Sequence, residues 1–594
     1  MRVNMKSLRE QLTERAVDAF KTCGFDPKYG EVVVSNRPDL GQFQCNGALS
    51  AAKQYKTNPR QIAQQVLDRL SHQKEIFKEI SLEGPGFINL TLTDTYILEH
   101  THHVESDPRL GCDPSAESQK MIIDYGGPNI AKSLHVGHLR SAIIGESLKH
   151  LARFLGHEVI GDAHLGDWGT QMGMVISELK RRQPDLPYFN PNYRGPYPAE
   201  PPVTISELEE IYPTVSARSK TDPEVLEAAR LATYELQQGR QGFRALWQHI
   251  YDISVIDLKE NYDKLGIHFD LWMGESDTKD RIAALIERVQ QEGWAYTSEG
   301  AIVIDVSDPE DKKEIPPLML VKSDGSVLYA TTDLATIDQR MNDFAPDGIL
   351  YVVDGRQSDH FCQVFRGAYK TGIALSTVKL EHIGFGTMNG KDGKPFKTRS
   401  GDTLKLKEFI QMITDKALVL MEEADIAKNY DADERMRIAH RVGIATLKFA
   451  DLMNHRTKNY IFDLDRFASF EGRTGPYLLY TAVRIKSILR NATERGLKPG
   501  IIGLPASDIE RNILLKISEL PDVLHYAFEN RAPNFICDYA YTMASLFNNF
   551  YHEHHILNEK DKKRQGSWLG LSVLSLKVLE LALELLGIEV PERM

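Results

Sequence analysis

The first 112 residues combine the hydrophobic periodicities of helices and of strands. Apolar side chains recur at steps of three and four in the first part of this segment, and two later apolar runs are bounded by turn residues. The predicted elements are helices over 8–20, 48–52 and 59–70 and strands over 80–82 and 87–92. An Asp-Pro-Arg-Leu-Gly stretch at 107–111 is typical of a linker. We therefore predict an α+β domain over residues 1–112.

A strand–helix–strand pattern follows over residues 119–174. Residues 121–123 form a short apolar strand before a Gly-Gly-Pro turn. Apolar positions then recur every three or four residues over 139–155, which predicts a long helix, and 158–160 predicts a second strand. The polar turn Gly-Asp-Trp-Gly at 166–169 follows that strand. Open α/β sheets bind ligands at the carboxyl ends of their strands, so this unit is a candidate binding site.

The remainder of the chain is predicted to complete the α/β domain and then to become helical. We expect a proline-rich loop at 184–202 to be exposed and to open a largely helical insertion at about 175–270. Apolar runs at 301–306, 318–320 and 349–353 predict strands in the second half of an interrupted α/β sheet. After residue 403 the pattern is almost entirely helical, which we divide into a connecting segment, 404–465, and a bundle, 466–594.

Composition places the chain among ordinary globular proteins. Its 594 residues are too many for one core, and 42% are hydrophobic and 26% charged. The apolar segment 571–590 is interrupted by charges, so we expect an amphipathic helix and no membrane partner. The start lacks an apolar targeting segment and the five cysteines form no C-x-x-C pair, which favours a cytoplasmic location. A net charge of −12 and a pI near 5.9 argue against nonspecific coating of nucleic acid, but not against RNA binding through local basic patches.

The stretch from 121 to 138 gives the strongest indication of chemistry. After the Gly-Gly-Pro turn, the chain brings Lys132, His135 and His138 to the start of the long helix. A helix start offers unpaired N–H groups and a partial positive charge, which suit phosphate. Gly137 leaves room for a nucleotide base against the backbone. Two imidazoles three residues apart share one helix face and can both donate hydrogen bonds to phosphate oxygens.

Two other interpretations of this stretch stay open from the residues alone. Zinc-binding helices usually space their histidines four apart with a glutamate between them, and no cysteine pair lies nearby, so zinc is disfavoured. An isolated His-x-Gly-His would be explained by ordinary polar residues at a helix start. The preceding strand, the long helix and the second strand with its glycine-rich turn favour the ligand-binding interpretation.

A second candidate locus is the segment 390–407, which contains glycine and proline and is rich in cations. Its cations include Lys391, Lys394, Lys397 and Arg399. One interpretation is a solvated basic hairpin. The other is a mobile loop that closes over a triphosphate and stabilises the charge that grows on leaving pyrophosphate. The segment lacks the spacing of a P-loop.

The sequence resembles class I aminoacyl-tRNA synthetases, and arginyl-tRNA synthetases in particular. The resemblance rests on His-Val-Gly-His at 135–138 with the preceding Asp-Tyr-Gly-Gly-Pro-Asn-Ile-Ala-Lys, and it extends over nearly the whole chain. It implies a multidomain α/β fold with a Rossmann-like catalytic domain over 113–403. The N-terminal domain, 1–112, would contact the tRNA elbow, and the all-α domain, 466–594, would bind the anticodon.

The resemblance assigns ATP binding and catalysis to the two loci. The residues expected to bind ATP are His135, Gly137, His138, Lys132 and Lys397. The segment 396–401 resembles the Lys-Met-Ser-Lys-Ser loop of class I synthetases, but Thr398 stands where the second lysine would be. Many arginyl enzymes share this loss and compensate with a lysine before the histidine motif, the place of Lys132. We therefore expect Lys132 to stabilise phosphate, with Lys397 and Arg399 as further catalytic cations.

Arginine recognition requires carboxylates, because the planar guanidinium pairs with them through two N–H groups. The residues to which the resemblance points for arginine are Asp124, Asn129, Tyr329, Asp333 and Gln357. Tyr329 and Asp333 stand four apart and would share a helix face, although a cap or a surface carboxylate explains Asp333 equally well. The family usually has glutamate at the position of Asp124, which keeps the charge on a shorter side chain.

The resemblance implies a reaction in two steps. The arginine carboxylate attacks the α-phosphate of ATP, and the 2′-OH of the terminal adenosine of tRNA(Arg) then takes the arginyl group. Mg²⁺ would arrive with ATP, so we expect no dedicated metal site, no tightly bound cofactor and a monomeric enzyme. Two rival hypotheses are a class I synthetase for another amino acid and a paralogue that binds tRNA without charging it.

Overall fold

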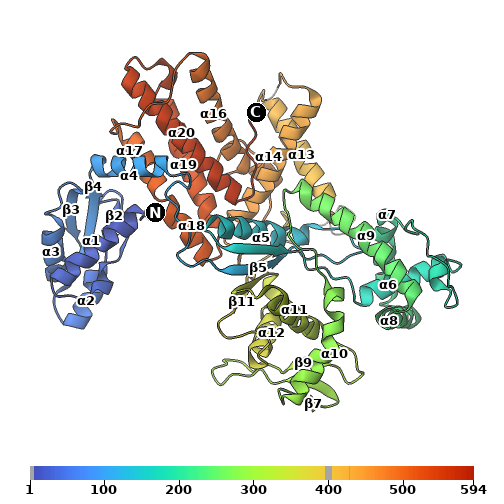
Figure 1. Cartoon of the computed structure of the whole chain (residues 1–594). Helices are drawn as coiled ribbons and strands as arrows, with labels where there is room; N and C mark the ends of the chain where they lie inside the picture. Colours follow the sequence, from blue (N-terminus) through green and yellow to red (C-terminus); the bar gives the residue numbers. More distant parts are fainter. Residues whose placement is uncertain (1–5, 395–403, 427) are drawn as a thin grey trace. The chain divides into compact units, whose positions relative to one another are not determined.

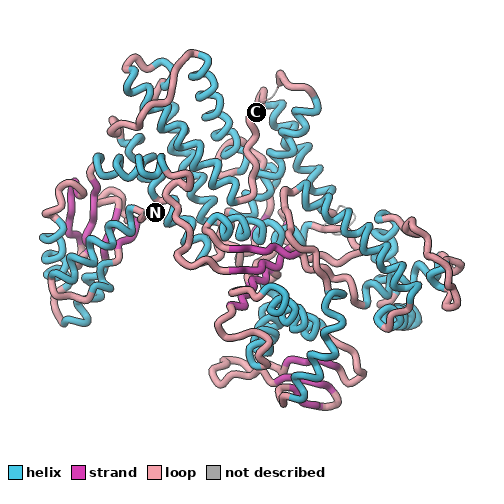
Figure 2. Tube along the Cα trace, viewed as in Figure 1, coloured by secondary structure: helices cyan, strands magenta, loops and turns pink. Residues whose placement is uncertain are grey.

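The computed structural model describes residues 6–394, 404–426 and 428–594, which form two compact units (Figure 1). The unit that we call the α/β unit contains residues 116–420 and 446–468. The unit that we call the terminal unit contains residues 1–115, 421–445 and 469–594. Helices predominate in both units, and the strands gather in small sheets (Figure 2).

The centre of the α/β unit is a four-stranded parallel sheet in the order β11-β10-β5-β6. Its strands are β5 (Lys120–Tyr125), β6 (Glu158–Asp162), β10 (Gly348–Val352) and β11 (Lys379–His382). In register, Ile122 of β5 lies opposite Ile160 on β6 and Ile349 on β10. β10 is buried along its whole length, as expected for a sheet that is covered on both faces. The strand order reverses between β5 and β10, and ligands bind at the carboxyl ends of strands beside such a switch point.

Three helices, α10 (Glu275–Gln291), α11 (Tyr329–Phe344) and α12 (Ser358–Lys370), share one apolar core with this sheet, and the 3-10 turn η3 (Gly355–Gln357) precedes α12. A fourth helix, α5 (Val136–Phe154), contacts β5, β6 and β10 outside that core. Ile122 and Ile349 from the sheet share this core with Val289 of α10, Leu334 of α11 and Val364 of α12. α5 directly follows β5, and α12 follows β10 through η3. Both helices therefore begin at the carboxyl edge of the sheet.

The helical insertion expected after the strand–helix–strand unit is present. Its helices are α6 (Thr170–Arg182), α7 (Ile205–Arg218), α8 (Pro223–Gln237) and α9 (Gln241–Lys264), with the 3-10 turn η2 (Pro187–Phe189). The loop predicted to be exposed at 184–202 is partly packed, because Tyr188 and Phe189 are buried and Tyr188 stacks on Tyr197. The chain then returns to the sheet, where Leu271 bridges in parallel to Asp162 at the end of β6.

Two of the predicted strands do not join the parallel sheet, which corrects our prediction. They are β8 (Ala301–Ile304) and β9 (Leu318–Val321), which form an antiparallel sheet with β7 (Ala295–Ser298). Glu299 and Gly300 join β7 to β8, both with positive φ. Such a two-residue hairpin joins only antiparallel strands. Of the three predicted runs, 349–353 alone entered the parallel sheet, as β10, because a short apolar run does not reveal its pairing partner.

The part of the chain after residue 403 is mainly helical, as predicted. Its first elements are α13 (Leu406–Glu423), α14 (Ala432–Leu452) and α15 (Leu464–Phe467). One short strand, β13 (Tyr460–Ile461), interrupts the helices and pairs in parallel with β12 (Met388–Asn389). A buried ion pair of 2.8 Å joins Arg140 of α5 to Asp451 at the end of α14, within the α/β unit.

The terminal unit contains an antiparallel sheet and a set of long helices. The strands, in the order β1-β2-β4-β3, are β1 (Val32–Val34), β2 (Phe43–Cys45), β4 (Phe87–Leu92) and β3 (Phe77–Glu83). The helices of the first 115 residues are α1 (Leu8–Thr22), η1 (Pro27–Gly30), α2 (Gly47–Tyr55), α3 (Pro59–Leu70) and α4 (Asp94–Ser106). The later helices are α16 (Gly475–Glu494), α17 (Asp508–Ser518), α18 (Leu520–Glu529), α19 (Asn534–Glu553), η4 (Ile556–Asn558) and α20 (Lys562–Leu585). The α+β pattern predicted for the start of the chain is confirmed. Across the described residues, no helix has the length and apolar character to cross a membrane.

Candidate active site

The histidine motif lies at the start of α5, shortly after β5 ends. His135 is the residue before the helix, and His138 lies in its first turn. Nδ1 of His135 accepts a hydrogen bond of 3.0 Å from the N–H of Gly137, and Nδ1 of His138 accepts one of 3.2 Å from the N–H of His135. The centres of the two rings lie 3.9 Å apart, with the planes tilted by 38°. The two imidazoles therefore cap the helix and hold each other in place.

Both imidazoles are neutral near pH 7. Burial lowers the pKa of His135 to about 4, and the positive charge of Lys132 contributes to this shift. Burial lowers the pKa of His138 to about 3, with smaller contributions from His135 and Lys132. Because Nδ1 of each neutral ring accepts a backbone N–H, we assign the ring proton to Nε2. The motif thus offers two Nε2–H donors to an anion at the positive end of a helix.

Lys132 and the end of the predicted basic loop both lie at this motif. Lys132 is half-buried, and burial lowers its pKa. Backbone hydrogen bonds of 3.2 and 2.8 Å join residues 404–406 to residues 134–136, so the segment that follows the loop runs beside the histidines. Lys397 and Arg399 lie outside the described residues.

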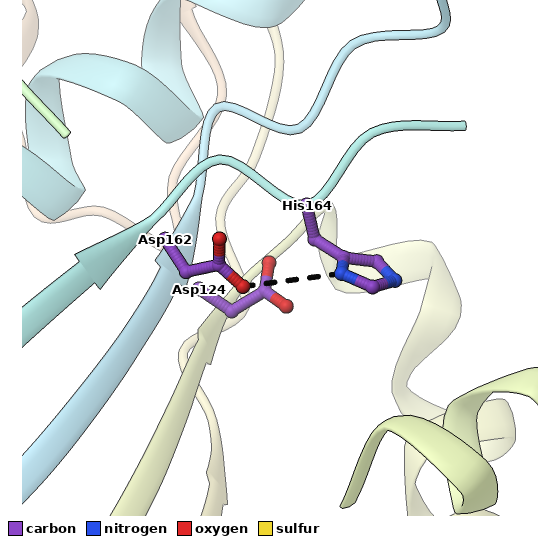
Figure 3. A group of neighbouring side chains, drawn as sticks. All are labelled: Asp124, Asp162 and His164. Carbon is purple, nitrogen blue, oxygen red and sulfur yellow. Dashed lines mark ion pairs between the residues drawn. The ribbon is translucent and has the colours of Figure 1, made fainter. Parts of the chain in front are cut away.

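Asp124, at the carboxyl end of β5, forms an ion pair with the guanidinium of Arg340 in the same chain. Nη2 of Arg340 lies 2.7 Å from Oδ2 of Asp124 and 2.6 Å from Oδ2 of Asp162. Figure 3 shows Asp124 and Asp162 side by side at the ends of neighbouring strands, with His164 in the segment after β6. Burial raises the pKa of Asp124, whereas the two carboxylates keep Arg340 charged and hold its pKa well above the usual value. The carboxylate expected to bind substrate arginine is thus paired with Arg340.

Asp124, Asp162 and His164 also form a group of the kind that can bind a metal ion. Their ligand atoms lie within 4.8 Å of one another, and Nδ1 of His164 is 3.9 Å from Oδ2 of Asp162. Arg340 donates to both carboxylates, however, so a cation already lies between them. A divalent ion would have to displace a buried guanidinium. The donor set fits an internal ion pair better than it fits a metal.

A second group of carboxylates lies at the starts of α10 and α11. Glu275 is the first residue of α10, Tyr329 is the first residue of α11, and Asp333 follows one turn later. Oε2 of Glu275 and the hydroxyl of Tyr329 both approach Gly169, at 3.9 and 3.7 Å from the place where a Cβ would stand. Burial raises the pKa of Glu275 to about 7, and the charges of Asp167 and Asp333 add to this shift. Two carboxylates and a phenol in one space can receive a guanidinium.

The Asp-Trp turn at 167–168 braces the start of α10. The carboxylate of Asp167 accepts hydrogen bonds from the N–H of Ser276 at 3.0 Å and from its hydroxyl at 2.5 Å. The indole N–H of Trp247 donates to the carbonyl of Asp167 at 2.9 Å, and the ring of Trp247 packs edge-on against Trp168. The turn therefore packs against Trp247 and also braces the start of α10.

The other two predicted arginine ligands lie on loops that follow adjacent strands. Asn129 is exposed in the loop after β5, and its Oδ1 lies so close to Gly166 that any side chain there would clash. Gln357 is exposed at the end of η3, after β10. β5 and β10 are the strands of the switch point, so both side chains lie at the edge of the sheet where ligands bind.

Sequence reasoning missed Glu275 and Arg340. Acidic residues are common in the first turn of helices for capping alone, so Glu275 has no distinctive signal in the sequence. Arg340 stands seven residues after Asp333 and therefore on the same helix face, which is a signal that could have been used. An arginine near the end of an amphipathic helix is usually solvated, however, and only the fold shows that Arg340 is buried.

Comparison with known proteins agrees with this fold. A family model described as "tRNA synthetases class I (R), catalytic domain" matches residues 103–464. Models described as "Arginyl tRNA synthetase N terminal domain" and "DALR anticodon binding domain" match residues 6–92 and 478–594. The parallel sheet and its histidine motif therefore belong to the catalytic domain of a class I aminoacyl-tRNA synthetase.

Full-length relatives narrow the class to one family. The arginine–tRNA ligase of Alkaliphilus oremlandii is 52% identical over 591 residues, covering 99% of this chain and 100% of that protein. That of Agathobacter rectalis is 48% identical over 600 residues, with the same coverage. The chain belongs to the arginyl-tRNA synthetase family, which confirms the resemblance seen in the sequence.

Solved structures share the fold along the whole chain. The arginyl-tRNA synthetase of Plasmodium falciparum superposes with a TM-score of 0.80 at 24% identity, covering 100% of both chains. That of Thermus thermophilus gives a TM-score of 0.79 at 21% identity, covering 99% of this chain and 100% of the other. The predicted combination of a Rossmann-like catalytic domain, an N-terminal domain and a helical anticodon-binding domain is confirmed.

Proposed function

We propose that this chain charges tRNA(Arg) with L-arginine, using ATP. In the first step the arginine carboxylate attacks the α-phosphate of ATP, and pyrophosphate leaves. In the second step the 2′-OH of the terminal adenosine of tRNA attacks the arginyl carbonyl, and AMP leaves. The observation that carries this proposal is the pair of neutral histidines with two Nε2–H donors at a helix start, beside the switch point of a parallel sheet.

Neither step needs a protein nucleophile, so the site acts by positioning the reactants and stabilising phosphate charge. We assign His135 and His138 to phosphate oxygens, Gly137 to the face of the adenine and Lys132 to the charge on the triphosphate. A single donor placed on developing charge contributes about 3–4 kcal/mol to the stabilisation of a transition state. Lys397 and Arg399 are proposed, from the sequence, as further cations for the leaving pyrophosphate.

The arginine subsite is proposed to centre on Glu275 and Asp333, with Tyr329 beside them. Their carboxylates suit a guanidinium, whereas a lysine ammonium would leave acceptors unpaired. Asn129 and Gln357 are proposed to bind the rest of the amino acid. Asp124, which was expected in this subsite, is reassigned to the ion pair with Arg340 that fixes α11 on the sheet.

The proposals for Mg²⁺, tRNA and the domain bounds rest on the family and on the domain matches. ATP is proposed to enter with Mg²⁺ on its phosphates, because Mg²⁺ prefers phosphate oxygens and water to a cage of side chains. The N-terminal domain, 1–112, and the helical domain, 466–594, are proposed to bind the elbow and the anticodon of tRNA. The catalytic domain is proposed to span 113–403, with the insertion at about 175–270 and the connecting segment at 404–465. We also propose that the enzyme works as a monomer in the cytoplasm.

Aminoacylation of a total tRNA pool tests the function directly. The purified chain is given ATP and each of the twenty labelled amino acids in turn, and label on tRNA is counted. Charging with arginine alone is expected. Charging with a different amino acid would refute the arginine subsite, and tRNA binding without any charging would favour the rival hypothesis of a non-catalytic paralogue.

A further inference from the structure

His360, in the first turn of α12, forms an ion pair with Asp333. Its Nε2 lies 2.6 Å from Oδ2 of Asp333, which is short for an N–H···O bond and typical of a bond between charged groups. The two side chains are 32% and 30% exposed, so the bond is partly shielded and the carboxylate remains accessible to a substrate. The helices that carry them share one apolar core, in which Leu334 of α11 and Val364 of α12 are buried.

The charge of Asp333 acts both on His360 and on a neighbouring carboxylate. The hydrogen bond that His360 donates to Asp333 raises the pKa of His360 against the opposing effect of burial. The charge of Asp333 also acts on Glu275 of α10, which in turn lies near Asp167. Among the described residues, His360 is the ion-pair partner of Asp333, and it reaches Asp333 from α12.

We propose that His360 is a positioning residue for arginine recognition, which binds one oxygen of Asp333 and fixes the plane of its carboxylate. This inference rests on the function proposed above for Asp333. A free carboxylate rotates about its Cβ–Cγ bond and presents its oxygens in many directions. With Oδ2 held by His360, Oδ1 has a defined direction, which a rigid guanidinium requires and a flexible ammonium does not. His360 therefore acts through Asp333 and touches neither ATP nor the reacting carboxylate.

A pair of amide substitutions separates positioning from a general structural role. In His360→Gln the amide N–H reaches far enough to bind Oδ2 of Asp333, whereas the shorter side chain of His360→Asn does not. The matched control is His382→Asn, because His382 stacks on Phe361 beside His360 but donates to the carbonyl of Val353. Each full-length variant is assayed by aminoacylation with saturating tRNA, and its thermal unfolding is recorded.

The expected result is a change confined to arginine. His360→Asn should raise the KM for arginine about tenfold or more, because an Asp333 carboxylate without a fixed orientation would lose its charge-assisted hydrogen bond to the guanidinium. The KM for ATP and the inhibition constant of lysine should stay within about twofold of wild type, and His360→Gln should restore most of the arginine affinity. The inference would be overturned if His360→Asn left the arginine KM unchanged or raised the KM for ATP equally. It would also be overturned if His382→Asn raised the arginine KM by the same factor, or if His360→Gln failed to restore the affinity for arginine. Wild-type protein that does not charge arginine would instead refute the proposed function itself.

Discussion

Arg340→Met removes the guanidinium that Asp124 and Asp162 share, and we expect it to destabilise the α/β unit strongly. The side chain of Arg340 is 1% exposed, and those of Asp124 and Asp162 are 12% and 0% exposed, so the carboxylates left behind cannot turn to water. Breaking a buried ion pair by removing one partner costs about 3–5 kcal/mol. Two charge-assisted hydrogen bonds at about 1.5–3 kcal/mol each give a similar range. The free energy of unfolding should therefore fall by about 3–5 kcal/mol.

Urea unfolding followed by tryptophan fluorescence measures this loss in the right unit. Trp568 lies in the terminal unit, so the substitution is made in a Trp568→Phe background. The remaining reporters, all in the α/β unit, are Trp168, Trp247, Trp272 and Trp294. The matched control is Lys313→Met, which breaks an ion pair with Asp359 whose side chains are 65% and 75% exposed. An exposed pair contributes about 0–1 kcal/mol, so the control should unfold almost as wild type does.

A loss no larger than that of the control would refute the argument that the two carboxylates depend on Arg340. Adding Asp124→Asn and Asp162→Asn to Arg340→Met should recover most of the loss, because the buried group then contains no unpaired charge. Acid should have the same effect, since protonation neutralises the unpaired carboxylates in the variant. A deficit that changes neither with pH nor with the added asparagines would show that lost packing, and not charge, is responsible.

Three further predictions concern the substrates, and a fourth concerns stability. Lys132→Ala should lower kcat for adenylate formation by about tenfold or more with little change in the arginine KM, as measured by ATP–pyrophosphate exchange in the presence of tRNA; unchanged activity would contradict the role of Lys132. Gly137→Ala should raise the KM for ATP and leave that for arginine unaltered, because a methyl group would stand 2.7 Å from Cε1 of His135; an unchanged ATP KM would show that the ring can move aside. The arginine KM of the wild type should fall as pH rises through about 7, where Glu275 ionises, whereas Glu275→Gln should show no such change. Between pH 4.5 and 7 the carboxyl group of Glu275 is ionised in the unfolded chain but still protonated in the folded one. The wild type should therefore lose stability relative to Glu275→Gln as the pH rises through this range, and the opposite trend would contradict the raised pKa of Glu275.

The histidine motif could be predicted from the sequence because its chemistry is local. A strand, a turn and a capped helix lie within a few residues of one another, so His135 and His138 had to meet at the start of α5. Tyr329 and Asp333 were likewise placed on one helix by their spacing. Glu275 could not be found in this way, because its meeting with Asp333 depends on how α10 packs against α11 in the core.

The error over the strands has the same physical origin. Apolar runs identified the strands β8, β9 and β10, but the choice of sheet depends on partners far along the chain. The turn between β7 and β8 carries a local signal in the sequence, because its second residue is Gly300. In the structure Glu299 and Gly300 both adopt positive φ. A short turn with a glycine at its second position argues for a hairpin, and weighing it would have placed β8 outside the parallel sheet.

The guanidinium of Arg340 distinguishes two groups of carboxylates, because it pairs with Asp124 and Asp162 but not with Asp333. Arg340 and Asp333 lie seven residues apart on α11, which corresponds to about 10 Å along the helix. At one end Arg340 satisfies Asp124 and Asp162, so a substrate arginine finds no unpaired carboxylate there. At the other end lies Asp333, at the centre of the proposed arginine subsite. Because the ion pair of Arg340 holds α11 against the sheet, it fixes how far Asp333 lies from the histidines that are proposed to bind ATP.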